Sequence, residues 1–230
     1  MKECRVRLSS FKREVMHRNQ KFTRDQFPID HGEFTPRAEK TVDPMTGLGM
    51  SCRLAAAISK LAASGQTIAV AETSAGGLIS AKLLAQPGAS KFYLGGVVTY
   101  TEASKTDLIG VDASKSRPTA TEPHAYELAA AVRARLGSDW AIGETGVAGP
   151  APNARGIAPG VCAIAVVGPG KRRLTKSLWP DDQLNASDAY GQAPKLSREE
   201  RMQQFSAAAI DLLCDAIAVE HGELTEREDN

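Results

Sequence analysis

The stretch Thr67-Ile-Ala-Val-Ala-Glu-Thr-Ser-Ala-Gly-Gly-Leu78 decides the fold. Its first half is a short, apolar and β-branched run, which predicts a buried strand, and a helical pattern follows from Leu78 to Leu84. Strand, tight turn and helix therefore succeed one another without a linker. Backbone amides at the start of such a helix lack intrahelical partners, so the turn is a place where an anion or a developing oxyanion is stabilised.

Strands and helices continue to alternate outside this stretch. The expected helices cover 51–64, a short segment ending at Ile109, 122–136 and a segment that starts at Ser197, and the expected strands cover 95–100, 140–143, 161–167 and 172–179. This alternation predicts an α/β fold, a single-domain three-layer α/β/α sandwich with a mixed, mostly parallel sheet. In such a fold, binding groups gather in the loops at one edge of the sheet.

Residues 1–49 differ in composition from the rest of the chain. From Lys2 to Arg24, eight basic residues stand against only Glu3 and Glu14. Such a segment is typical of an organellar transit peptide, and the alternatives are a disordered extension or translated sequence upstream of a start at Met50. We therefore divide the chain into a basic extension (1–49), one globular domain (50–219) and an acidic tail (220–230), with a surface insertion at 181–194.

Composition narrows the classes of partner. The net charge of +1 comes from 28 basic and 27 acidic residues, which gives no overall field that attracts nucleic acid. No apolar run approaches the roughly 18 residues that span a bilayer. The cysteines (Cys4, Cys52, Cys162 and Cys214) lie far apart without metal-ligand spacing, as in an intracellular protein with reduced thiols. We expect a small-molecule partner, and no nucleic acid, membrane or metal.

Two segments carry groups suited to catalysis. Thr73 and Ser74 place hydroxyls in the turn, and Gly76 and Gly77 allow a ligand to approach the backbone closely. Tyr100 ends a predicted strand, and Lys105 follows it within the next helix. A lysine partly removed from water has a lowered pKa and can take a proton from a hydroxyl, so a hydroxyl and Lys105 would form a nucleophile and base pair, assisted by Tyr100. Taken singly, a tyrosine such as Tyr100 is more often a half-buried strand residue, and a lysine such as Lys105 more often a solvated helix residue, than either is catalytic.

A tyrosine followed by a lysine is also found in nicotinamide-dependent dehydrogenases, so we considered this class of enzyme. Short-chain dehydrogenases space these residues as YxxxK, whereas one more residue separates Tyr100 from Lys105. The first predicted strand also lacks a glycine-rich dinucleotide fingerprint after it. We therefore reject this reading.

The motifs together resemble the CinA C-terminal domain family over about Leu54 to Leu213. The family pattern AESCTGG is similar to Ala71–Gly77, and GGVVxYSNEAKxxLLGV is similar to Gly95–Val111. Shorter similarities follow in the same order at Pro87–Phe92, Thr119–Glu122, Thr145–Pro150 and Pro159–Val161. Thr73 stands where the family has serine, and Ser74 where it has cysteine.

The resemblance implies a hydrolase that deamidates nicotinamide mononucleotide to nicotinate mononucleotide and ammonia, in pyridine nucleotide recycling. It implies catalytic roles for Thr73 or Ser74, Tyr100 and Lys105, with no cofactor, and a homo-oligomer in the cytoplasm, or in an organelle if 1–49 is a transit peptide. The implied substrate-binding residues are Glu72, Gly76, Gly77, Thr121, Thr145, Gly146, Ala148 and Gly149. The alternative is a nucleotide-binding or scaffold protein that kept the fold and lost catalysis.

Overall fold

The computed structural model describes residues 50–112, 114–170, 172–180 and 196–223. All of them belong to one compact unit. Its helices are α1 (Met50–Ser64), α2 (Leu78–Leu84), α3 (Glu102–Ile109), α4 (Glu122–Leu136) and α5 (Arg198–Glu220), with a short 3₁₀ helix η2 (Ala89–Lys91). Its strands are β1 (Ile68–Glu72), β2 (Tyr93–Val98), β3 (Trp140–Gly146), β4 (Cys162–Val167) and β5 (Arg173–Leu178).

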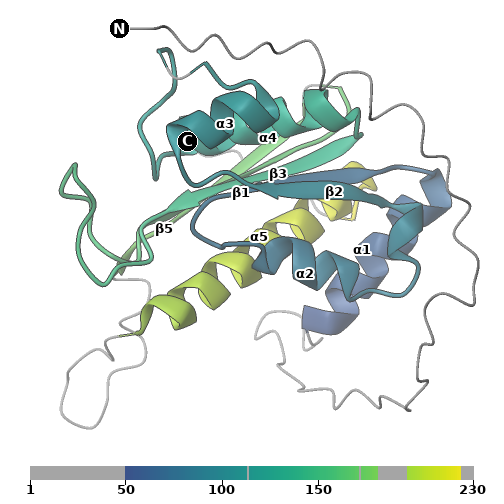
Figure 1. Ribbon diagram of the computed structural model, residues 1–230. Helices are drawn as coiled ribbons and strands as arrows, with labels where there is room; N and C mark the ends of the chain where they lie inside the picture. Colours follow the sequence, from purple (N-terminus) through teal and green to yellow (C-terminus); the bar gives the residue numbers. More distant parts are fainter. Residues whose placement is uncertain (1–49, 113, 171, 181–195, 224–230) are drawn as a thin grey trace, which may run out of the picture. The chain divides into compact units, whose positions relative to one another are not determined.

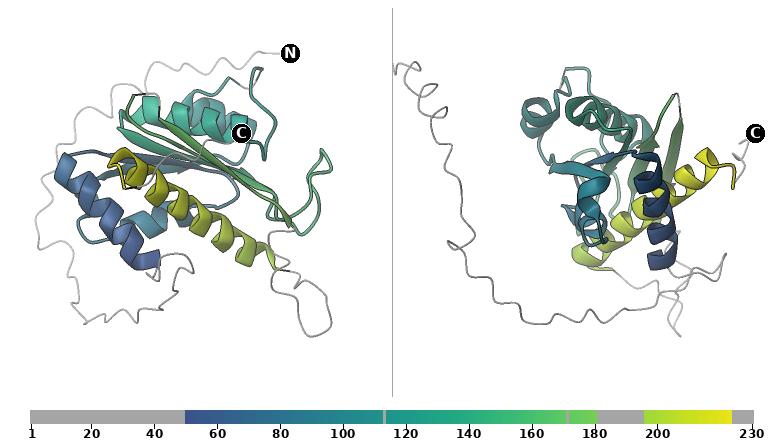
Figure 2. Two further views of the ribbon diagram at one scale, coloured as in Figure 1. Left: turned by 180° about the vertical axis from the view of Figure 1, so that it is seen from behind. Right: turned by 90° about the vertical axis from the view of Figure 1, so that its right-hand side faces the viewer.

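The strands form one mixed sheet in the order β2-β1-β3-β4-β5. β1 runs parallel to both β2 and β3, whereas β4 runs antiparallel to both β3 and β5. Among the described strands, only β4 therefore runs against the others. Helices α3 and α4 cover one face of the sheet, and α1, α2 and α5 cover the other (Figures 1 and 2). The predicted three-layer sandwich with a mixed, mostly parallel sheet is confirmed.

Most predicted elements agree with the structure, and two differ in a way that concerns the site. β2 starts at Tyr93 and ends at Val98, two residues before Tyr100. β3 continues beyond Gly143 to Gly146, because Glu144, Thr145 and Gly146 all pair with β4. These polar residues do not resemble a buried strand, so the predicted strand ended at Gly143 and the predicted loop started at Gly146. The predicted extension 1–49 and the insertion 181–194 lie outside the described residues.

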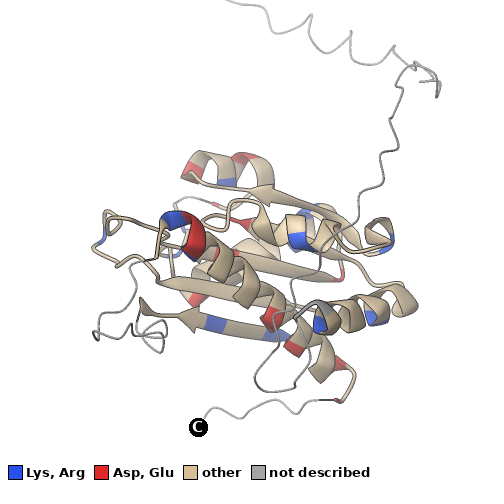
Figure 3. Ribbon diagram, turned by 90° about the horizontal axis from the view of Figure 1, so that it is seen from below, with Lys and Arg blue, Asp and Glu red and all other residues tan. Residues whose placement is uncertain are grey.

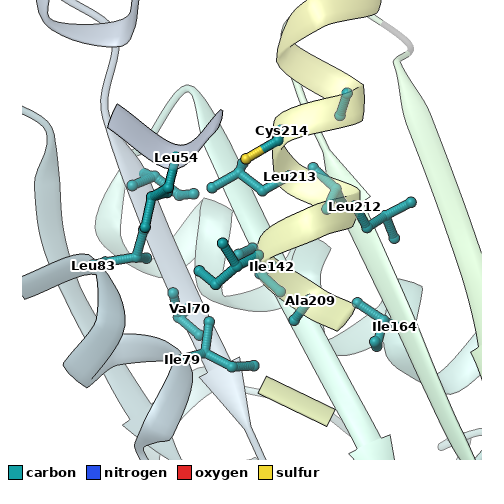
Figure 4. Packing of buried hydrophobic residues seen from close by; sticks show 14 of the residues in the cluster. Leu54, Val70, Ile79, Leu83, Ile142, Ile164, Ala209, Leu212, Leu213 and Cys214 are labelled. Atoms are coloured by element: carbon teal, nitrogen blue, oxygen red, sulfur yellow. The ribbon is translucent and has the colours of Figure 1, made fainter. Parts of the chain in front are cut away.

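The two larger parts of the core lie on the two faces of the sheet. Between the sheet and α5, Val70, Ile142 and Ile164 meet Ala209 and Leu213 (Figure 4). Between the sheet and α4, small residues dominate, such as Ala69, Ala71, Ala141, Ala163 and Ala165. Small side chains on the sheet bring α4 close to it.

Helix α5 is long and apolar enough to cross a membrane by length and composition. The sequence pattern did not reveal this, since polar residues such as Asp211 and Asp215 interrupt the linear run of apolar residues. Phe205, Ala209, Leu213 and Ile217 on that face are fully buried in the protein. Packing on the sheet therefore accounts for the apolar character of α5, as for the core helix of a globular domain.

The globular unit suggests a test of the domain boundaries. A chain limited to 50–223 is expected to melt within about 3 °C of the full chain, because a larger change would mean a loss of more than about 1 kcal/mol in a domain of this size. The measurement is calorimetry of both chains at one concentration. A drop well beyond this range would show that residues 1–49 or the tail pack on the domain.

Candidate functional site

The turn after β1 is held by its glycines. Gly76 and Gly77 both have positive φ angles, of 66° and 100°, which other residues adopt only with strain. A Cβ on Gly76 would also lie 2.8 Å from Cε of Met202 on α5. Backbone conformation and packing therefore account for these glycines, rather than the approach of a ligand that the sequence suggested.

Glu72, predicted to bind substrate, instead caps α2 from within the protein. Its side chain is fully buried, and its carboxylate accepts hydrogen bonds from the amides of Gly77 (2.8 Å), Ile79 (3.1 Å) and Ser80 (2.8 Å) and from the hydroxyl of Ser80 (2.6 Å). The amide of Gly77 is thus occupied and does not face an oxyanion, contrary to the expectation. Of the amides of 73–80, those of Ser74 and Gly76 alone have no partner among the described residues.

A second buried carboxylate, Glu144 on β3, holds the turn itself. It accepts hydrogen bonds from the amides of Thr73 (3.0 Å) and Ala75 (2.9 Å). It also accepts one from the hydroxyl of Ser74 and a longer contact, 3.6 Å, from the thiol of Cys162. Burial raises the pKa of Glu144, and the hydrogen bonds from the turn oppose that rise. Glu144 was not predicted from the sequence, where its only signal is an acidic residue directly after an apolar strand.

A cavity of about 240 Å³ opens beside the turn, at the carboxyl ends of β1 and β3. It is lined by Ser74, Tyr100, Gly146, Val147, Ala148, Gly149, Ala151, Pro152, Asn153 and Arg198. The cavity thus brings together five of the residues predicted from the sequence: Ser74, Tyr100, Gly146, Ala148 and Gly149. Thr73 and Lys105 do not line it.

A larger groove of about 620 Å³ lies at the opposite edge of the sheet, between the end of α4 and the start of β5. Tyr126, Arg133 and Arg173 are among its lining residues, and no residue of the predicted site is. We take the smaller cavity as the candidate site, because it contains a hydroxyl from the motif turn.

The first turns of α5 supply the positive charge of the cavity. Arg198 donates to the carbonyl oxygen of Gly149 and, at 3.2 Å, to the hydroxyl of Tyr100. Arg201 donates to the carbonyl oxygen of Ala148 at 3.2 Å, and its Nε is buried without a partner among the described residues. Figure 3 shows that charges of both signs are spread over the helices and strands seen from below. The first turn of α5 also carries Glu199 and Glu200, and Arg198 is the charged side chain that lines the cavity.

Lys105 lies buried on the other side of the sheet, between α3 and α4. Only 3% of its side chain is exposed, and its Nζ lies 2.9 Å from Oε1 of Glu102. Its charge acts on the nearby His124, whose pKa is lowered chiefly by burial and further by Lys105. His124 is held by Glu127, at 3.0 Å from Nδ1. Lys105 and Tyr100, which the sequence pattern grouped, therefore do not share the cavity.

Thr73 and Ser74 point toward different surroundings. Side chains alternate between the faces of a strand, and Ala69 and Ala71 of β1 face α4, so the same alternation places Thr73 on the side of α4 and Lys105. No described residue accepts a hydrogen bond from the Thr73 hydroxyl, and its side chain is nearly buried. Ser74 lies on the other side, against Glu144.

Thr121 and Thr145, which were predicted to bind substrate, form structural hydrogen bonds near α4. The hydroxyl of Thr121 caps that helix by accepting from the amide of His124 at 3.4 Å. The hydroxyl of Thr145 accepts from the amide of Ala120 at 3.1 Å and is buried. Neither lines the cavity, so the structure offers no direct contact for a ligand at these two positions.

Comparison with known proteins finds matches to one protein family. Residues 53–217 match the family described as CinA C-terminal domain. A CinA-like protein of Gloeobacter violaceus is 40% identical over 123 residues, which are 53% of this chain and 29% of the relative. One of Mycobacterium marinum is 39% identical over 114 residues, 48% of this chain and 27% of the relative. The chain thus covers less than a third of these curated relatives.

Solved structures show the same fold. A CinA superfamily protein of Klebsiella pneumoniae superposes with a TM-score of 0.59 at 25% identity, over 74% of this chain and 96% of the other. The competence/damage inducible protein CihA of Agrobacterium tumefaciens superposes with a TM-score of 0.60 at 21% identity, over 73% and 94% of the two chains.

Proposed function

The chain belongs to the CinA C-terminal domain family, and from this premise we propose that it is an amide hydrolase acting on nicotinamide mononucleotide. The products are nicotinate mononucleotide and ammonia, and the reaction belongs to pyridine nucleotide recycling. The observation that supports this proposal most is a motif hydroxyl, Ser74, that lines a cavity together with the positively charged Arg198. A hydroxyl can attack the carboxamide, and a guanidinium can bind the phosphate.

Two pairs, each made of a hydroxyl and a base, are available for the attack on the carboxamide. The resemblance implies Thr73 with Lys105 as its base, on the α4 side of the sheet, and Tyr100 assisting. The second pair is Ser74 with Glu144, which is in direct contact through a hydrogen bond on the α5 side. In both schemes the hydroxyl oxygen adds to the amide carbon, ammonia leaves, and water releases the acid. Neither scheme uses a cofactor.

One observation favours a second function, that of a nucleotide-binding protein without catalysis. Glu72 and Glu144 occupy most backbone amides of the motif turn, which would otherwise be donors for an oxyanion. The amides of Ser74 and Gly76 remain as donors. If these amides do not stabilise the oxyanion, the cavity binds the nucleotide and leaves it intact.

The test is ammonia release by the full chain from nicotinamide mononucleotide, nicotinamide riboside, nicotinamide and glutamine. We expect turnover of the mononucleotide, with the riboside and the free amide much slower because they lack the phosphate. Equilibrium binding of the mononucleotide without ammonia release would support the non-catalytic protein. Absence of both turnover and binding would overturn the proposed substrate class.

Arg198 gives a specific prediction for substrate recognition. Arg198→Ala is expected to lower kcat/KM for the mononucleotide by about 10- to 100-fold, because a hydrogen bond to a charged group contributes about 1.5–3 kcal/mol. The riboside should lose less, since it has no phosphate. Arg135→Ala, at an exposed position near the end of α4, is the matched control. Equal losses for both substrates would remove Arg198 from phosphate recognition.

We also propose an intracellular location and a homo-oligomeric state. The relatives named above are bacterial. The organelle hypothesis depends on residues 1–49, outside the described part, and finds no support in these relatives.

A further inference from the structure

We propose that Ser74 is the nucleophile and Glu144 its base, an inference that deepens the proposed amide hydrolysis and rests on it. Ser74 lines the cavity, and its hydroxyl donates a hydrogen bond to Glu144 Oε1. A nucleophile needs access to the substrate on one side and a proton acceptor on the other. Among the described residues, Ser74 is the motif hydroxyl that has both.

The position of Glu144 is what a proton acceptor for Ser74 requires. Its other oxygen, Oε2, is held by the amides of Thr73 and Ala75, so Oε1 is fixed against the Ser74 hydroxyl. Both amides belong to the residues on either side of Ser74. The carboxylate therefore cannot move away from the hydroxyl without breaking the turn.

The surroundings of Glu144 make it a stronger proton acceptor than an exposed carboxylate. It is fully buried, and no described lysine or arginine forms an ion pair with it. The titratable groups that face it are Glu72 from β1 and Cys162 from β4, and the charge of Glu72 disfavours a second negative charge nearby. A carboxylate without a cation nearby accepts a proton more readily, which suits general-base catalysis closer to neutral pH.

Gly146 packs closely beside the Ser74 hydroxyl. A Cβ at this position would lie 2.8 Å from Ser74 Oγ and 2.9 Å from the carbonyl oxygen of Val161. Gly146 lines the same cavity. Any other residue at this position would therefore push Ser74 Oγ or the backbone of Val161 out of place, so the glycine preserves the position of the hydroxyl.

The chemical step balances without a further reactant besides water. The Ser74 oxygen forms a bond to the amide carbon while its proton passes to Glu144, and the carbonyl π electrons move to the oxygen. The intermediate collapses, the carbon–nitrogen bond breaks, and ammonia takes the proton from Glu144. Water then adds to the acyl carbon and gives its proton to Glu144, the bond to Oγ breaks, and Ser74 recovers the proton.

The inference is tested by covalent labelling of the full chain with a fluorophosphonate, followed by peptide mass mapping. We expect the label on Ser74, and we expect Glu144→Gln to slow labelling by about 10²- to 10⁴-fold, the usual contribution of a general base. Ser206→Ala, which removes a buried hydroxyl of α5 bonded to the carbonyl oxygen of Gln203, serves as the control and should label like the wild type. Circular dichroism checks that Glu144→Gln is folded.

Each outcome has a defined meaning. A label on Thr73, no label on Ser74, or undiminished labelling of folded Glu144→Gln would overturn the inference. If Glu144→Gln does not fold, the mapped position in the wild type still decides between Ser74 and Thr73. Labelling of Ser74 that depends on Glu144, in a protein that hydrolyses no amide of the panel, would uphold the pair and reject the proposed substrate. Amide hydrolysis with a label on Thr73 would support the proposed substrate and reject Ser74 and Glu144 as the reacting pair.

Discussion

Replacement of Ser74 by alanine is expected to lower kcat for amide hydrolysis by at least about 10³-fold, because the loss of a covalent nucleophile leaves only binding and oxyanion stabilisation. KM should change little, since the hydroxyl contributes to the transition state rather than to substrate binding. Steady-state ammonia release measures both constants. Ser206→Ala, the buried serine on α5, is the control for the removal of a hydroxyl elsewhere.

The alternative pair, Thr73 and Lys105, predicts the opposite result for the same measurement of ammonia release. If Thr73 and Lys105 carry the reaction, Thr73→Val and Lys105→Met should each lose about 10²-fold or more, and Ser74→Ala much less. With Ser74 as the nucleophile, we expect losses below about tenfold for both, because Thr73 and Lys105 lie outside the cavity. Lys91→Met, at an exposed position, controls for the loss of a lysine. Large losses in Thr73→Val together with an active Ser74→Ala would identify Thr73 as the nucleophile.

The sequence predicted those parts of the fold that depend on local chemistry. Helix α4 runs from Glu122 to Leu136 as expected, because Thr121 caps its start and Gly137 ends it in a left-handed conformation. Ser197 likewise starts α5 through a capping box with Glu200. Such signals lie within a few residues of the boundary that they determine, so they can be read from the sequence alone.

The candidate site could be predicted only in part, since it depends on which strand ends meet. Ser74 and Glu144 are 70 residues apart and come together through the parallel pairing of β1 with β3. The sequence does not reveal this register, and a polar residue in a buried strand resembles a loop. Tyr100 and Lys105 are five residues apart, yet the end of β2 and the turn of α3 direct them to different surroundings. For this pair, closeness in sequence did not predict closeness in the structure.

The packing of α4 on β3 gives the largest expected change in stability. A Cβ on Gly143 would lie 2.0 Å from the carbonyl oxygen of Ala125 and 2.6 Å from the amide nitrogen of Ala129. Both are backbone atoms of α4, so no side chain can rotate away. Gly143→Ala is therefore expected to lower the free energy of unfolding by about 3 kcal/mol, the upper end for overpacking, and the melting temperature by about 6–12 °C.

The control for Gly143→Ala is Gly65→Ala. Gly65 has a φ of +68°, and a Cβ there would meet no atom within 4 Å, so that variant carries backbone strain alone, at a cost of about 1 kcal/mol. Because Gly143 directly precedes Glu144, a displacement of β3 away from α4 would also move the carboxylate relative to the Ser74 hydroxyl. Fluorophosphonate labelling of folded Gly143→Ala should then slow, whereas Gly65→Ala should label normally. Equal melting temperatures for the two variants would show that α4 yields to the extra methyl group, and that the close contact does not hold β3 in place.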